Sequence, residues 1–77
     1  MASIEKLIQK MKNQPYGITY NEAARVLTSF NYRFARQNGS HCHYINESGD
    51  VITIVRRNDA IKRVYVDAIL DRIGEIK

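Results

Sequence analysis

The sequence predicts an α+β fold in which helices pack on one face of a three-stranded antiparallel sheet. Two amphipathic helical patterns open the chain, three short β-prone segments follow, and a further helical pattern closes it. The connections between the three β-prone segments are short, which favours an antiparallel meander. Helices on one sheet face and solvent on the other give a two-layer sandwich.

The first two helices are marked by the spacing of their apolar residues and by capping signals. Ser3 is a suitable N-cap for the first helix, and Pro15 and Gly17 break the pattern after it. Thr19 and Glu22 match a capping box at the start of the second helix, which we expect to end at Asn31. The apolar positions at helical spacing are Ile4, Leu7, Ile8 and Met11 in the first helix, and Ala23, Val26, Leu27 and Phe30 in the second.

From Tyr32 the period changes from helical to two, as in strands. We expect strands from Tyr32 to a turn at residues 37–39, over residues 41–46, and over residues 51–55. The final helix should run from about Arg63 to Ile76, although no good N-cap stands before it. The tyrosines at positions 16, 20, 44 and 65 are most simply packing residues.

Length and composition restrict the class of protein. The 77 residues predict one domain, residues 1–77, and the 44% apolar and 26% charged content is ordinary for a soluble globular protein. Cys42 is the only cysteine, which excludes an internal disulfide and points to a reducing compartment, the cytoplasm. We find no apolar stretch long enough to cross a membrane and no secretory signal pattern.

Positive charge is concentrated in the middle of the chain. The formal net charge is +4, and residues 25–63 carry seven Arg or Lys residues against three acidic ones. A polyanion such as RNA suits this distribution. A solvated basic surface is the other interpretation of the same charges.

Both histidines lie in the second predicted strand, directly after Gly39 and Ser40. Alternation along a strand places Cys42 and Tyr44 on one face and His41 and His43 on the other. An aromatic ring and a thiol suit the face covered by helices. We therefore expect the two histidines on the open face of the sheet.

The expected surroundings of His41 suit chemistry on RNA. An imidazole changes charge near neutral pH and can take the proton of a ribose 2′-hydroxyl. Glycine and serine before it allow the backbone to approach a phosphate closely. Arginines can hold that phosphate and stabilise the charge that develops on it. The arginines expected to form a basic rim are Arg33, Arg36, Arg56 and Arg57.

Each of these features also has a plainer interpretation. A histidine in a short strand is more often a surface residue than a catalyst. His41 and His43 provide only two metal ligands, without a suitably spaced carboxylate, so we expect no metal and no cofactor. Cys42 is disfavoured as a nucleophile because its position in the strand directs it towards the core.

Gly39-Ser40-His41, followed by the aromatic Tyr44, resembles the signature of the HicA family of toxin–antitoxin mRNA interferases. The resemblance covers essentially the whole chain. Many members have a proline after the third strand and a histidine shortly beyond, where this chain has Val55-Arg56-Arg57-Asn58. The further stretches that resemble the family are residues 4–8, 19–30, 51–54 and 61–66.

This resemblance implies a fold similar to the double-stranded-RNA-binding domain and RNA cleavage that depends on His41. It also implies a HicB-type antitoxin that covers this histidine. We therefore expect a metal-independent endoribonuclease, with His43 or Tyr44 as a helper of undetermined role. A non-catalytic RNA-binding module and a degenerate toxin that acts only by protein binding are the alternatives. The expected RNA contacts are Gly39, Ser40, Arg33, Arg36, His43, Arg56 and Arg57.

Overall fold

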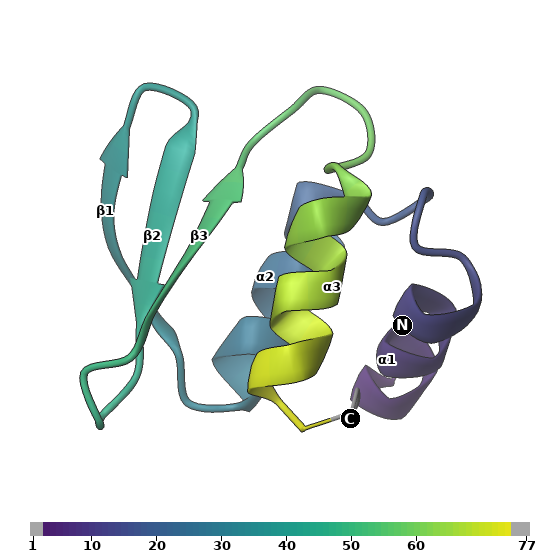
Figure 1. Ribbon diagram of the computed structural model, residues 1–77, viewed down its shortest axis with the longest axis horizontal. Helices are drawn as coiled ribbons and strands as arrows, with labels where there is room; N and C mark the ends of the chain where they lie inside the picture. The colour runs from purple at the N-terminus through teal and green to yellow at the C-terminus, as the bar shows by residue number, and fades with distance from the viewer. Residues whose placement is uncertain (1–2, 75–77) are drawn as a thin grey trace.

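The computed structural model describes residues 3–74, and within them three helices and a three-stranded antiparallel sheet confirm the predicted α+β class (Figure 1). The strands follow one another in the order β1-β2-β3, a simple meander. The elements are α1 (Ile4–Asn13), α2 (Tyr20–Ser29), β1 (Arg33–Asn38), β2 (His41–Ile45), β3 (Val51–Val55) and α3 (Arg63–Arg72).

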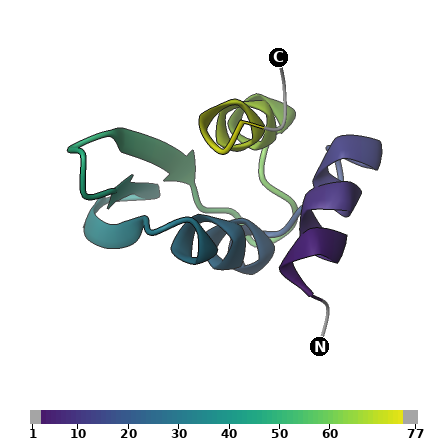
Figure 2. The ribbon, with the colours of Figure 1, turned by 90° about the horizontal axis from the view of Figure 1, so that it is seen from below.

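The helices form two layers behind the sheet. Figure 2 shows α2 and α3 between the sheet and α1, and α1 packs against both of these helices. The arrangement therefore has one layer more than the two-layer sandwich we expected. The α2–α3 pair on one sheet face is consistent with the packing of the double-stranded-RNA-binding domain.

Both N-terminal helices begin at the caps that the sequence predicts. The Lys6 amide donates to Ser3 Oγ, and at the start of α2 the Thr19 and Glu22 side chains each accept from the other residue's amide. These bonds satisfy amides that have no partner inside the helix. The helix α2 stops at Ser29, because Asn31 adopts a left-handed conformation with φ +69°. Phe30 therefore caps the helix instead of continuing its buried stripe, and it is 37% exposed.

The last helix starts where predicted but is shorter than predicted. Lys62 occupies the N-cap without a side-chain hydrogen bond, as the absence of a good capping residue indicated. The helix α3 ends at Arg72, because Gly74 has a φ of +81°, a left-handed conformation that terminates helices. Residues 75–77, which the prediction included in part, lie outside the described residues.

Two of the three strands differ by a residue from the prediction. Tyr32 is not part of β1 but lies buried just before it, and β2 ends at Ile45 instead of residue 46. The turn between β1 and β2 contains Gly39 at φ +61°, a conformation that favours glycine. The third strand, Val51–Val55, is confirmed.

One apolar cluster joins all three helices to β2 and β3. In these two strands buried and partly exposed residues alternate, so one face of the sheet belongs to the core. Every residue of β1 is exposed, which makes it the more open edge of the sheet. The buried members of the cluster are Leu7, Met11, Ile18, Ala23, Val26, Leu27, Tyr32, Cys42, Tyr44, Ile52, Ile54, Ile61, Val66, Ile69 and Leu70.

The interpretation of the tyrosines as packing residues is right for three of the four. Tyr44 is buried, and Tyr20 and Tyr65 pack partly buried against the core. Tyr16 is 71% exposed and interacts instead with Arg63, whose guanidinium lies 5.5 Å from the ring centroid and donates to the hydroxyl over 3.0 Å. This pair links the α1–α2 connection to the start of α3.

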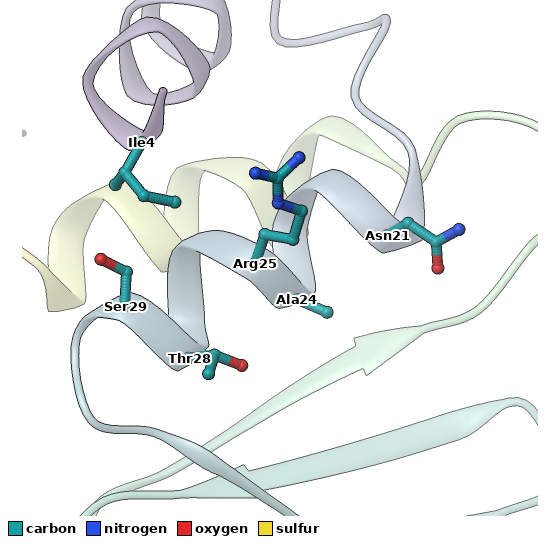
Figure 3. Close-up of a pocket in the computed structure, with 6 residues that line it drawn as sticks. All are labelled: Ile4, Asn21, Ala24, Arg25, Thr28 and Ser29. Carbon is teal, nitrogen blue, oxygen red and sulfur yellow. The ribbon is translucent and has the colours of Figure 1, made fainter. Parts of the chain in front are cut away.

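A hollow with a volume of about 620 Å³ lies beside α1 and α2 (Figure 3). None of the residues predicted to contact RNA lines it. Its lining residues are Ile4, Asn21, Ala24, Arg25, Thr28 and Ser29.

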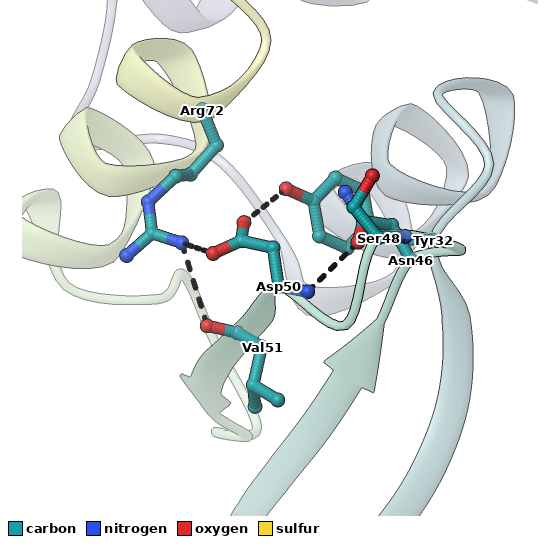
Figure 4. Close-up of polar contacts among 6 residues, drawn as sticks. All are labelled: Tyr32, Asn46, Ser48, Asp50, Val51 and Arg72. Carbon is teal, nitrogen blue, oxygen red and sulfur yellow. Dashed lines mark hydrogen bonds and ion pairs between the residues drawn. The ribbon is translucent and has the colours of Figure 1, made fainter.

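A polar network connects the β2–β3 turn to α3 and to the segment that follows α2. The Tyr32 hydroxyl, just after α2, donates to Asp50 Oδ2 over 2.5 Å, and Arg72 of α3 donates to Asp50 Oδ1 (Figure 4). The backbone amide of Asp50 donates to Asn46 Oδ1. The hydrogen bonds from Tyr32 and then from Arg72 lower the pKa of Asp50 below its ordinary value of 3.8.

Asp50→Asn is expected to lower the free energy of unfolding at pH 7, because the charged acceptor of Tyr32 and Arg72 is lost. A carboxyl group whose pKa is lower in the folded state stabilises the protein fully above its unfolded pKa. That stabilisation is lost as the pH falls through the lower, folded-state pKa. Urea unfolding of both proteins between pH 7 and pH 2 should therefore show a difference that shrinks on acidification below 3.8.

Asp71→Asn is the matched control, because it also removes one negative charge, in this case from α3, and Asp71 makes no side-chain bond to this network. An equal loss of stability in the control, or a difference that grows on acidification, would contradict the role given to Asp50.

Candidate active site on the open face of the sheet

The two histidines of β2 lie on the face of the sheet that the helices leave open. Cys42 and Tyr44 are buried, whereas His41 is exposed and His43 is half-buried. The strand register pairs His41 with Asn38 of β1 and with Val55 of β3. The predicted orientation of the two histidines is confirmed.

Tyr44 serves the core and does not reach the open face. Its hydroxyl lies 2.6 Å from that of Tyr20 on α2, and its ring meets Phe34 edge-on at 5.7 Å between centroids. Burial, followed by the hydrogen bond to Tyr44, raises the pKa of the Tyr20 hydroxyl. Of the two helpers considered for His41, only His43 shares its face.

Cys42 is fully buried as a free thiol, as its position in the strand predicts. A thiol in apolar surroundings is not accessible to a substrate at the surface. The structure therefore gives no support to Cys42 as a nucleophile.

A bulge in β1 brings two arginines to the face that carries the histidines. Phe34 pairs with Tyr44, but the next pair is Arg36 with His43, so Ala35 is an extra residue on β1. Without the bulge, strict alternation would place Arg33 and Arg36 on opposite faces. With it, Arg33 lies opposite Ile45 and Arg36 opposite His43, both on the open face.

The side chain of His43 is held by the neighbouring strand. Its Nδ1 and the hydroxyl of Thr53, its partner on β3, form a hydrogen bond of 2.8 Å. The contact leaves Nε2 as the ring nitrogen that does not bond to Thr53. No side chain among residues 3–74 hydrogen-bonds the imidazole of His41, which remains available to a ligand.

Arg56 and Arg57 lie apart from the other two arginines. The guanidinium of Arg56 lies 5.2 Å from the ring centroid of Tyr20, on the helix side of the sheet. Arg57 forms an exposed ion pair of 3.3 Å with Asp59 in the loop after β3. The four arginines therefore form two groups, and not the single rim around the histidines that the sequence suggested.

The second group lines a polar hollow next to the turn that precedes His41. This hollow, of about 340 Å³, brings together Gly39, Ser40, Arg56 and Arg57, four of the residues predicted to contact RNA. The Arg56 amide donates to the Ser40 carbonyl over 2.7 Å, which fixes the two walls relative to each other. The remaining lining residues are Gln37 and Asn58.

A second polar hollow, of about 310 Å³, shares the loop at residues 56–58 with the first. Its other wall is the start of α2, with Thr19, Tyr20 and Asn21, and Asp59 completes it. Backbone amides at a helix start and arginine side chains both favour anionic groups. The end of the sheet nearest His41 is therefore polar on both sides of this loop, and Arg56 and Arg57 line both hollows.

Four residues of the site were missed in the sequence, and one of them, Gln37, lines the hollow at Gly39 and Ser40. Asn38 and Thr53 follow from the strand register, because a two-residue turn places residue 38 opposite His41 and alternation turns Thr53 outward. Asn58, which lines both polar hollows, carries no signal that separates it from an ordinary loop residue.

The described residues were also compared with the requirements of a metal site and of a membrane-spanning helix. Residues 3–74 contain no group of three or more His, Cys, Asp or Glu side chains that could hold a metal ion. None of the helices in the same part of the chain is both long enough and apolar enough to span a membrane.

Helices on one face of a three-stranded antiparallel sheet, with histidines and arginines on the other, define a small basic protein whose fold is like that of the double-stranded-RNA-binding domain. Residues 20–75 match the family model described as the HicA toxin of bacterial toxin–antitoxin systems. This match covers most of the chain, from α2 through α3. The protein therefore belongs to the HicA toxin family, which confirms the resemblance seen in the sequence.

Membership in this family makes the protein a toxin and implies an antitoxin as its partner. The matched segment includes every residue that the sequence predicted to take part in catalysis or RNA binding, whereas α1 precedes it. Comparisons with curated proteins and with solved structures found no match.

Proposed function

We propose that this toxin is an endoribonuclease that cleaves mRNA without a metal ion, with His41 as its catalytic residue. The observation that carries the proposal is the exposed imidazole of His41 on the open face, between Arg36 and the basic hollow at Gly39 and Ser40. A substrate of this kind places the toxin in the cytoplasm, where mRNA is found.

The reaction uses a nucleophile that RNA itself supplies. His41 takes the proton of a ribose 2′-hydroxyl, and the 2′-oxygen forms a bond to the adjacent phosphorus. The bond from phosphorus to the 5′-oxygen breaks and the departing oxygen takes up a proton, which leaves a 2′,3′-cyclic phosphate and a 5′-hydroxyl end. Since the attacking oxygen belongs to the substrate, no metal-bound water is required.

The arginines bind the phosphate backbone in this proposal. Arg36 pairs with His43, two residue pairs along the sheet from His41 and on the same face, and can stabilise charge on the reacting phosphate. The hollow formed by Gly39, Ser40, Arg56 and Arg57 is open to a neighbouring phosphate. His43 and Arg33 extend the same basic surface along the open face.

His41→Ala is expected to reduce RNA cleavage by roughly 10²–10⁴-fold, the usual contribution of a general base. RNA binding should remain, because the arginines and the hollow are unchanged. Gel analysis of a purified mRNA measures cleavage, and fluorescence anisotropy with a short single-stranded RNA measures binding. Growth arrest on induction should be lost together with cleavage.

Thr28→Ala, an exposed change on α2, is the matched control and should cleave like the native protein. Equal cleavage by the native protein and His41→Ala would exclude His41 as the catalyst. A native protein that binds RNA but does not cleave it would indicate a non-catalytic RNA-binding module. One that binds only its antitoxin would indicate a degenerate toxin.

Arg36→Gln is expected to weaken RNA binding and to make the binding constant less sensitive to salt. The substitution is made in the His41→Ala background so that the RNA stays intact. Loss of one phosphate contact to a single strand lowers the slope of log K against log salt by about 0.7. Anisotropy titrations between 50 and 200 mM salt measure this slope. Lys6→Gln, made in the same background, is the control: it removes one positive charge from α1 and should leave the slope unchanged. Equal slopes for His41→Ala alone, with Arg36→Gln and with Lys6→Gln would show that Arg36 does not contact the RNA.

We further propose that the antitoxin is of the HicB type and that it covers the open face, including His41. Family membership supports an antitoxin, and the strand β1, in which every residue is exposed, and the histidine face are accessible to one. Cleavage should fall in proportion to added antitoxin and stop at saturation. His41 should become protected from diethyl pyrocarbonate in the complex. Continued cleavage or unchanged modification of His41 at saturation would exclude this mode of inhibition.

A further inference from the structure

We propose that His43 is the second proton-transfer group of the reaction, the general acid that protonates the departing 5′-oxygen. The inference rests on the proposed function, in which His41 is the base. The proton from Nε2 of His43 goes to the 5′-oxygen as its bond to phosphorus breaks. His41 meanwhile holds the proton from the 2′-hydroxyl, so charge and protons balance over the step.

The separation of the two histidines fits an acid and a base on either side of one phosphate. They are two residues apart on the same face of β2, a distance of roughly 6–7 Å along a strand. In an in-line displacement the attacking and leaving oxygens lie on opposite sides of phosphorus. Imidazoles this far apart can each reach one of these oxygens at hydrogen-bond distance.

The hydrogen bond to Thr53 prepares His43 for this role. Nδ1 lies 2.8 Å from the Thr53 hydroxyl oxygen. In the charged ring both nitrogens carry a proton, so Nδ1–H donates to this hydroxyl and the proton on Nε2 is the one that can be transferred. The half-buried position and the bond to β3 restrict the ring orientation, whereas the His41 ring makes no such bond. A fixed general acid needs this kind of support from a neighbouring group.

No other described side chain competes for the role. The groups that face His43 from the neighbouring strands are Arg36 on β1 and Thr53 on β3, with Arg33 two residue pairs further along β1 on the same face. Arginine does not release its proton at neutral pH, and a threonine hydroxyl is a poor acid. Tyr44, the other candidate, is bonded to Tyr20 on the covered face.

The test uses the bond that the native protein cleaves in an RNA oligonucleotide, after that bond has been mapped. The same oligonucleotide is synthesised with sulfur in place of the bridging 5′-oxygen at this bond. A thiolate leaves without protonation, so the sulfur substrate does not need a general acid. His43→Asn is the principal variant, because its amide can keep the hydrogen bond to Thr53 but cannot titrate.

We expect His43→Asn to cleave the oxygen substrate at least about 10²-fold more slowly than the native protein and the sulfur substrate within a few-fold of it. His41→Ala should be slow on both substrates. The pH–rate profile of the native protein on the oxygen substrate should be bell-shaped. His43→Asn should lose the alkaline limb, because a general acid acts only while it is protonated.

Thr53→Val, which removes the hydroxyl that orients His43, should slow cleavage of the oxygen substrate alone. Native-like cleavage of the oxygen substrate by His43→Asn would overturn the proposal, as would equal losses on both substrates. Circular dichroism melting curves of each variant show whether it is folded. A native protein that cleaves neither substrate would refute the endoribonuclease itself, an outcome separate from the failure of His43 alone.

Discussion

In β2, Cys42 and Tyr44 are buried on the helix side, and the hydroxyl of Tyr44 is bonded to that of Tyr20 on α2. A pleated strand cannot bury two alternate residues without turning those beside them outward. The burial of Cys42 and Tyr44, which packs the sheet against the helices, therefore also directs His41 and His43 to the open face. A one-residue slip would exchange the two sets, and it would expose a thiol and an aromatic ring while burying two imidazoles.

The rest of the site depends on how neighbouring strands complete this face. The bulge at Ala35 turns Arg36 to the side of His43, and Thr53 on β3 holds the His43 ring. At the end of the sheet Arg56 turns the other way and lies over Tyr20. The same tyrosine thus supports Tyr44 in the core and one wall of the basic hollow. Packing and the proposed binding of RNA share residues at this end of the molecule, whereas along the open face they are separate.

Features set by local periodicity were predictable from the sequence, and features set by pairing were not. The capping box at Thr19, the strand Val51–Val55 and the outward histidines all follow from residue spacing. The bulge at Ala35 depends on which partner each residue meets across the sheet, which spacing does not show. The apolar residues at helical spacing in α1 showed that one face of this helix is buried. They did not show that this face packs against α2 and α3 instead of the sheet.

In the proposed function the open face of the sheet is the surface that binds RNA. Amide chemical-shift mapping of isotope-labelled His41→Ala with an uncleaved single-stranded RNA tests this directly. The largest changes should fall on Arg36, His43, Ser40 and Asn58, across the histidine face and the hollow beside it. Changes confined to the α2 surface between Asn21 and Ser29, at the hollow in Figure 3, would contradict the account.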